Sequence, residues 1–208
     1  MENDKQQALQ AHIKKLVAAI DATPTDATNY LELSALLLEQ KAYSEAIELL
    51  EKAHAVVEKP QELDFNLAVA YYYAENYDKA LAILASLPVD DAVLYQEGLI
   101  YFKLGEVKKA LAHVLTMTSG TNASRELLAD IWLALGDSAE AAKSLLQIEE
   151  ASRNSKVWFM LGVAQSANEK ELAEHSFSQS KKLNPEYFTA AMQQYESLLA
   201  LVKGKSDD

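Results

Sequence analysis

Histidine is the side chain best suited to acid–base catalysis and metal binding near neutral pH. The chain has four histidines, which lie far apart in the sequence: His12, His54, His113 and His175. His175 has an acidic residue one helical turn away, at Glu171. This pair lacks the second histidine with which a His-Glu-x-x-His motif binds zinc. We therefore expect the histidines to have structural roles rather than catalytic or metal-binding ones.

Paired carboxylates are a second kind of catalytic chemistry, and the chain contains the adjacent pairs Asp90-Asp91 and Glu149-Glu150. Both pairs fall where helix ends or solvated helix faces are expected. The sequence contains no Gly-x-Gly-x-x-Gly, Gly-x-x-x-x-Gly-Lys or Gly-x-Ser-x-Gly motif, which would indicate a nucleotide site or a nucleophile elbow. We therefore expect no catalytic residues, no metal site and no cofactor.

The charge of the chain limits its partners. The 208 residues include 31 Asp and Glu against 19 Lys and Arg, which gives a formal charge of −12. Proteins that bind nucleic acids present a basic stripe to the phosphates, and no run of Lys or Arg here exceeds two residues. We therefore exclude nucleic acid and expect a neutral or basic protein partner, which an acidic surface attracts more readily.

Cysteine and targeting signals are both missing from the sequence. Without cysteine the chain cannot form disulfides or thiolate zinc sites. The polar residues 1–7 offer no apolar segment of a signal peptide. No stretch approaches the ~20 apolar residues of a membrane span. We expect a cytoplasmic protein without membrane contact.

The elements that must position any site are helices. Half of the residues are hydrophobic, and only six Gly and four Pro interrupt the chain. Five segments recur, each with an apolar run, a short polar turn and a second run that has an alanine near its start. These alanines are 30 to 34 residues apart, at Ala46, Ala80, Ala110, Ala141 and Ala173.

Other positions fall into the same register. Four residues after each alanine comes a large apolar side chain, at Leu50, Leu84, Val114, Leu145 and Phe177. Twelve residues before it comes a small one in the first four segments, at Ser34, Ala68, Gly98 and Ala129. The residue before the small one is predicted to be core as well, at Leu33, Leu67 and Leu128, with Glu97 as the exception. Antiparallel helices approach closely where a small residue faces a bulky one, and such pairs stack into a solenoid.

This pattern resembles the tetratricopeptide repeat. The fifth segment has Trp158-x2-Leu161-Gly162, followed by Ala173-x3-Phe177 and Pro185. The family's Gly-x-Tyr turn is matched in part by Tyr43 and Tyr77, and in part by Gly105 and Gly136. The resemblance implies one all-α domain, a right-handed α-solenoid of about 12 helices. Its expected parts are an N-terminal helix over 3–22, five helix pairs over 27–185, a capping helix over 186–203 and a tail over 204–208.

The resemblance also implies a binding surface, because the first helix of each pair lines a concave groove in this family. The positions that face the groove are Leu31, Phe65, Val69, Tyr72, Tyr95, Leu99, Phe102, Glu126, Asp130 and Phe159. Most are apolar, and residues 67–74 are apolar nearly all round, whereas a surface helix should be polar opposite its core. Two interpretations stay open: this face binds a partner, or curvature or the C-terminal helix covers it.

One known binding mode of the family is absent. Members that bind chaperone tails clamp a terminal carboxylate with Lys, Asn and Arg side chains, but here Leu31, Ala35, Ala92 and Gln96 occupy four of those positions. We therefore predict a scaffold that holds an apolar segment of another protein by its apolar anchors. The alternative is a structural protein that forms a homodimer through the same face or through a terminal helix.

Overall fold

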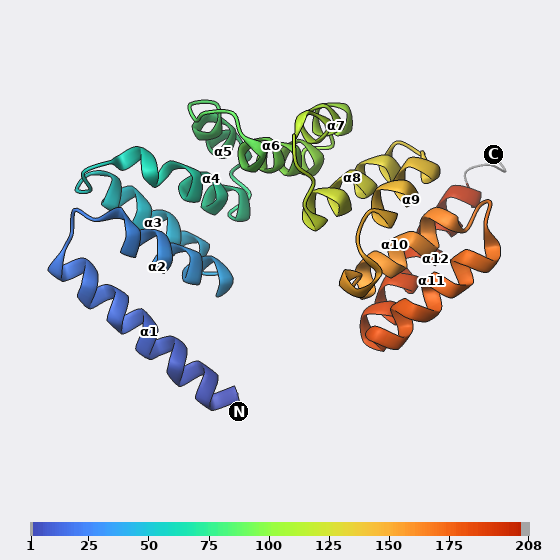
Figure 1. Ribbon diagram of the computed structural model, residues 1–208, viewed down its shortest axis with the longest axis horizontal. Helices are drawn as coiled ribbons and strands as arrows, with labels where there is room; N and C mark the ends of the chain where they lie inside the picture. The colour runs from blue at the N-terminus through green and yellow to red at the C-terminus, as the bar shows by residue number, and fades with distance from the viewer. Residues whose placement is uncertain (1, 205–208) are drawn as a thin grey trace. The chain divides into compact units, whose positions relative to one another are not determined.

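The computed structural model describes the backbone of residues 2–204 and the side chains of residues 6–200. Within this part the chain forms 12 α-helices and two short 3-10 helices, and no β-strand (Figure 1). The expected all-α fold of about 12 helices is confirmed.

Helices α1 (Glu2–Ala22) and α12 (Pro185–Gly204) are the first and last described helices. Between them, α2 (Ala27–Glu39) packs with α3 (Tyr43–His54), α4 (Asp64–Tyr73) with α5 (Tyr77–Leu84), α8 (Asn122–Ala134) with α9 (Ser138–Leu146), and α10 (Ser155–Gln165) with α11 (Lys170–Leu183). In the sequence, α6 (Asp91–Lys103) and α7 (Val107–Thr116) follow α5 as the helices of the third repeat. The 3-10 helices Pro60–Glu62 and Glu150–Ser152 precede α4 and α10.

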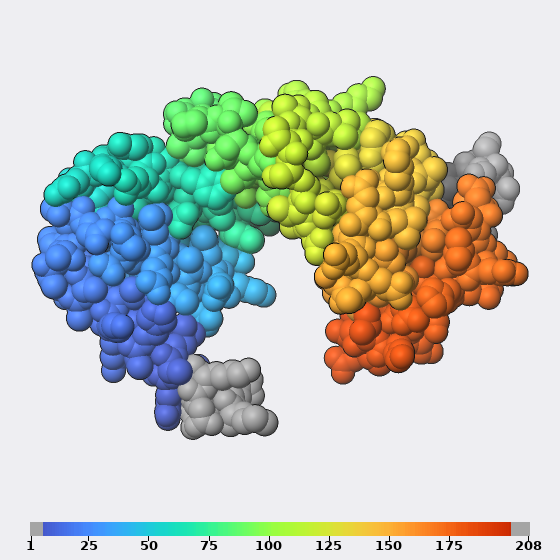
Figure 2. Space-filling model, viewed as in Figure 1, coloured from blue at the N-terminus to red at the C-terminus, as the bar shows by residue number. Residues whose placement is uncertain are grey.

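The helices pack into two compact units, Met1–Ile100 and Tyr101–Asp208, and the boundary falls inside α6. Figure 2 shows the first unit in blue to green and the second in yellow-green to red. The first unit has a continuous core that includes Ala46, Leu50 and Leu84, and the second has one around Leu145 and Trp158. Each unit therefore has apolar packing of its own.

The helix crossings follow the register expected from the sequence. The five alanines that define the repeat are all buried, with exposed fractions of 0% to 4%. The approach is very close in the fifth pair, where a Cβ added to Gly162 would lie 2.5 Å from ring atoms of Phe177. Glycine at this position allows the Phe177 ring to close against α10.

The register did not predict one buried residue of α8. Leu127 has 4% of its surface exposed, and the predicted Leu128 is partly buried. The buried face of α8 therefore includes residues beyond the predicted core positions.

The turns within the first four pairs share one backbone conformation. A residue with positive φ lies at each of them, at Lys41 (59°), Glu75 (58°), Gly105 (75°) and Gly136 (81°). The hydrogen bonds also repeat: in the fourth pair Gly136 N donates to Leu133 O, and Asp137 N donates to Trp132 O. Glycine adopts this left-handed conformation without the strain that a side chain adds. The common turn therefore explains why glycine occupies this position in two of the repeats.

The fifth turn differs because it is one residue shorter. Here Asn168 N and Glu169 N both donate to Gln165 O, and none of the residues has positive φ. Helix starts are fixed locally, since the side chains of Asn76, Asp137 and Asn154 each accept a backbone N–H of the first helical turn.

Candidate protein-interaction site

In the first unit, the predicted groove residues lie on the first helices of the pairs and are all partly buried. They are Leu31 on α2, Phe65, Val69 and Tyr72 on α4, and Tyr95 and Leu99 on α6. Leu31, Phe65 and Tyr72 pack against the core while part of each side chain stays accessible. These residues form an apolar layer that separates the core from solvent.

A cluster of four tyrosines continues this layer at the turn ends of the first two repeats. Tyr72 contacts Tyr73 with ring centroids 5.2 Å apart and Tyr77 with centroids 6.0 Å apart. Tyr73, which is 48% exposed, stacks on Tyr43 at 5.4 Å. We call Tyr43, Tyr72, Tyr73 and Tyr77 the tyrosine cluster. Its residues come from three helices, since Tyr43 begins α3, Tyr72 and Tyr73 end α4, and Tyr77 begins α5. The stack of Tyr73 on Tyr43 joins the first repeat to the second.

Sequence reasoning identified Tyr72 as a site residue but missed Tyr43, Tyr73 and Tyr77. Two signals could have found them. Tyr43 and Tyr77 occupy the same turn position in neighbouring repeats, and Tyr73 follows Tyr72 directly. The contact between repeats, which places Tyr43 on Tyr73, depends on how the helix pairs stack and could not be read from a single repeat.

The hydroxyl groups of the cluster differ from those of the core tyrosines. Tyr71 OH donates to Glu51 and accepts from Lys79 Nζ at 3.2 Å, and Tyr30 OH donates to Pro24 O at 3.1 Å. Among the side chains that the structure describes, no hydrogen bond engages a hydroxyl of the tyrosine cluster. These hydroxyls are therefore available to solvent or to a partner.

Tyr72, the most central residue of the cluster by its ring contacts, is uncharged at physiological pH. Burial, followed by the proximity of the Tyr73, Tyr77 and Tyr95 hydroxyls, raises the pKa of Tyr72 to about 12. Tyr72 therefore keeps its proton and can both donate and accept a hydrogen bond. The surface that results is apolar on its rings and polar at its rim.

In the second unit, the expected groove position at Phe159 is wrong. The Phe159 ring is only 8% exposed and lies under α12, with centroids 6.3 Å from Tyr187, 6.1 Å from Phe188 and 6.4 Å from Tyr195. Tyr195 OH also lies 3.1 Å from the hydroxyl of Ser166, at the end of α10. Figure 1 shows α12 beside α10 and α11. The C-terminal helix therefore covers this face of the fifth repeat.

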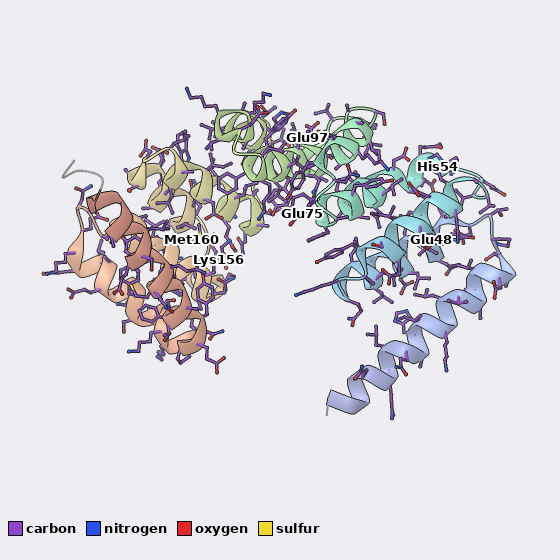
Figure 3. The ribbon with its side chains drawn as sticks, turned by 180° about the vertical axis from the view of Figure 1, so that it is seen from behind. Glu48, His54, Glu75, Glu97, Lys156 and Met160 are labelled. Carbon is purple, nitrogen blue, oxygen red and sulfur yellow. The ribbon has the colours of Figure 1, made fainter. Side chains whose placement is uncertain are left out.

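The two predicted acidic site residues are paired within the protein. Lys156, which Figure 3 labels on α10, has its Nζ atom 3.3 Å from Glu126 Oε2 and 3.4 Å from Asp130 Oδ2, both on α8. Burial raises the pKa of Asp130 despite the attraction of Lys156. Burial lowers the pKa of Lys156, but the two carboxylates outweigh it and the pKa is raised. A basic partner would have to displace Lys156 to reach these carboxylates.

Phe102, the remaining predicted residue, lies in the second unit and is partly buried. The histidines have separate surroundings: His12 Nε2 lies 2.9 Å from Glu32, His54 Nε2 lies 3.1 Å from Asp64, and rings of Tyr101 and Trp158 contact His113 and His175. Over residues 6–200, no three His, Asp or Glu side chains come close enough to hold a metal ion. None of the described helices combines the length and apolar character that a membrane span requires.

Comparison with known proteins defines the class of this fold. Residues 37–99 match the family model of the tetratricopeptide repeat. A chain of the crystal structure of the APC/C hetero-tetramer Cut9-Hcn1 is similar over 89% of this chain, with a TM-score of 0.76 and 14% identity. This chain spans only 39% of the length of that one. No curated protein sequence matches significantly.

Two further solved structures are similar over nearly their whole lengths. The pilF protein of Pseudomonas aeruginosa has a TM-score of 0.70 and 15% identity, with 93% of this chain and 99% of that chain covered. YrrB, described as a TPR protein with an unusual peptide-binding site, has a TM-score of 0.59 and 17% identity over 87% of this chain and 97% of its own. Residues 37–99 therefore match the tetratricopeptide repeat, and the described helices have the fold of the solved tetratricopeptide repeat structures.

Proposed function

We propose that the protein is an interaction scaffold that binds a polypeptide segment on the first helices of its N-terminal repeats. The observation that carries this proposal is the apolar layer of Phe65, Val69 and Tyr72 on α4, which stays partly accessible beside the tyrosine cluster. Exposed contiguous apolar surface commonly marks a binding site, and aromatic side chains are frequent anchors of binding energy.

The partner that fits this surface has apolar anchors and a neutral or basic charge. Aromatic rings bury a large area at a small entropic cost, because each has few rotatable bonds. The helices are already fixed by their packing, so little ordering of the scaffold opposes association. A segment that is extended or helical could place apolar side chains on Leu31, Phe65, Val69, Tyr95 and Leu99.

Site-specific photo-crosslinking tests the proposal with a matched control. Val69 on α4 and Val163 on α10 occupy the same register position in the second and fifth repeats, but α12 covers the face of α10 on both sides of Val163. We would place a benzophenone side chain at either position, expose cell lysate to light, and identify crosslinked polypeptides by mass spectrometry. We expect a specific partner at Val69 and none at Val163.

The partner identified in this way would then be purified for calorimetry. The Phe65→Ala variant should weaken binding by about tenfold, as for a moderate hot spot. Equal crosslinking at both positions, or unchanged affinity of the variant, would contradict the proposal. If the product crosslinked at Val69 is a second copy of this chain, and sedimentation shows a dimer, the surface serves self-association instead.

A further inference from the structure

We propose that the tyrosine cluster binds arginine side chains in a basic segment of the partner protein. This inference rests on the proposed function and adds the chemistry of recognition. Three observations carry it: the distribution of charge along the chain, the unpaired carboxylates beside the cluster, and aromatic rings that no cation of the chain occupies.

The negative charge of the protein is concentrated in its first unit. Residues 1–100 contain 17 Asp and Glu against seven Lys and no Arg, which is −10 of the total formal charge of −12. The remaining residues contain 14 acidic and 12 basic side chains and are almost neutral. A basic segment is therefore attracted to the first unit, where the tyrosine cluster lies, much more strongly than to the second.

Three carboxylates lie in the same turns as the cluster. Glu39 ends α2, Glu75 lies in the α4–α5 turn where Figure 3 labels it, and Asp78 follows Tyr77 directly. All three are exposed, and over the described side chains none of them forms an ion pair. Two lysines lie in these turns, and Lys79 is in a cation–π contact with Tyr71. Lys41 alone does not balance the three carboxylates, so negative charge is in local excess.

Four acidic groups of the second unit, by contrast with these three, are paired with lysines. Lys156 neutralises Glu126 and Asp130, Lys143 pairs with Glu140 at 3.1 Å, and Lys109 pairs with Glu106 at 2.5 Å. A cation from outside would have to compete with these lysines. In the turns of the first unit it would meet carboxylates with no such competitor.

The chain itself shows that its aromatic rings hold cations. Lys79 Nζ lies 4.7 Å from the ring centroid of Tyr71, Lys109 Nζ lies 5.2 Å from that of Tyr101, and the guanidinium of Arg153 lies 5.0 Å from Trp158. Such contacts are attractive because the ring face is electron-rich. No Lys or Arg side chain in the described part of the chain lies over a ring of the tyrosine cluster.

Arginine fits these features better than lysine does. Its planar guanidinium can stack on the exposed ring of Tyr73 while its N–H groups donate to a carboxylate or to a tyrosine hydroxyl. The unengaged hydroxyls of Tyr43 and Tyr77 can accept such bonds. A lysine ammonium is a point charge that keeps its water more strongly and cannot stack in this way.

A fluorescent peptide of about 12 residues that repeats Arg-Gly-Ser is the probe, and polarisation measures its binding to the full chain. A peptide with citrulline in place of arginine keeps the shape but loses the charge, and a third peptide carries lysine. We expect the citrulline peptide to bind at least about tenfold more weakly and the lysine peptide about threefold more weakly. Equal binding of the arginine and citrulline peptides would overturn the proposal.

Protein variants locate the binding. The Tyr43→Leu/Tyr73→Leu protein should bind the arginine peptide at least about fivefold more weakly, and Glu75→Gln/Asp78→Asn should weaken it as well. Tyr195→Leu in the second unit is the matched control and should leave affinity unchanged. If Tyr195→Leu has the same effect as the cluster variant, or if the cluster variant binds normally, the assignment is wrong.

Fluorine NMR of the chain labelled with 3-fluorotyrosine tests the same site while every tyrosine is kept. The Tyr43 and Tyr73 signals should shift on titration with the arginine peptide, and the Tyr187 signal should not. Unshifted cluster signals would overturn the inference. Crosslinking of a partner at Val69 together with failed peptide binding would contradict this chemistry alone, whereas peptide binding without a crosslinked partner would contradict the scaffold function.

Discussion

Phe65 and Phe159 occupy the same register position in the second and fifth repeats, yet one contributes to a surface and the other to a core. Phe65 is partly buried on α4 within the first unit. Phe159 is 8% exposed on α10, because three rings of α12 close over it. The difference comes from the element that follows, since the two positions are equivalent within their own helix pairs.

The comparison shows that a groove position in a repeat is not by itself a binding site. In the second unit α12 covers Phe159, and Lys156 pairs with Glu126 and Asp130. The first unit leaves four tyrosine hydroxyls without a described intramolecular partner and carries most of the negative charge. Recognition is therefore expected in the first unit and stability in the second.

The largest expected effect is at the two phenylalanines. Phe159→Ala removes a buried ring and leaves a cavity beneath α12, which should lower the free energy of unfolding by about 3–5 kcal/mol. Phe65→Ala removes a ring that is partly accessible and should cost about 1–2 kcal/mol. Urea denaturation followed by circular dichroism measures both. Equal losses would show that the two rings have the same environment.

The helix crossing at Gly162 gives a smaller effect. Gly162→Ala places a Cβ against the Phe177 ring, and the resulting shift should cost about 1–3 kcal/mol. In the second repeat Ala68 is equivalent to Gly162 and is fully buried. Leu84, which has no ring, is equivalent to Phe177. Ala68→Gly should therefore cost about 1 kcal/mol through helix propensity alone. A Gly162→Ala protein as stable as the parent would contradict the crossing geometry.

The turns should respond in opposite directions in the two units. Gly136→Ala puts a side chain at a φ of 81° and should lower stability by about 1 kcal/mol. Glu75→Gly relieves the strain of a φ of 58° and should raise stability by about 0.5 kcal/mol after the entropic cost of glycine. Thermal melts of the two single variants provide the measurement. Destabilisation by Glu75→Gly would indicate that its side chain contributes to the fold.

The smallest effect is confined to alkaline pH. Because the pKa of Tyr72 is raised to about 12, the folded chain holds this proton more tightly than the unfolded chain, in which the tyrosine pKa is about 10. The stability due to this group is therefore complete below about pH 10 and is lost as the pH rises through about 12. Tyr72→Phe should remove one ionisation near pH 12 from the tyrosinate absorbance titration. The control Tyr73→Phe should retain that ionisation.

The repeat could be predicted from the sequence because it rests on local rules. The five alanines, the small residue twelve positions earlier and the glycine of two turns are determined by helix crossing and by backbone conformation. For this reason the buried positions agreed at all five alanines, whereas the burial of Leu127 was not predicted. Its burial depends on how broad a face of α8 is covered, which one helix pair does not specify.

The site was predictable only in part, because it depends on contacts between repeats. The register identified Phe65, Val69 and Tyr72 but could not show that Tyr43 stacks on Tyr73. It also could not show that α12 returns to cover Phe159, because the same aromatic pattern on α12 could have met solvent or a partner. Pairing of Lys156 with Glu126 and Asp130 joins residues 30 and 26 positions apart and has no local signal.

Tyrosine nitration, quantified by peptide mass spectrometry over time, tests most directly whether the aromatic surface is open in the first unit and closed in the second. Tyr73 is 48% exposed, whereas Tyr195 is bonded to Ser166, and burial raises the pKa of Tyr187, which disfavours the reactive phenolate. The account predicts that Tyr73 reacts about tenfold faster than Tyr187 and Tyr195. Reaction of Tyr187 or Tyr195 at the rate of Tyr73 would mean that α12 does not close the second unit, and would contradict the account.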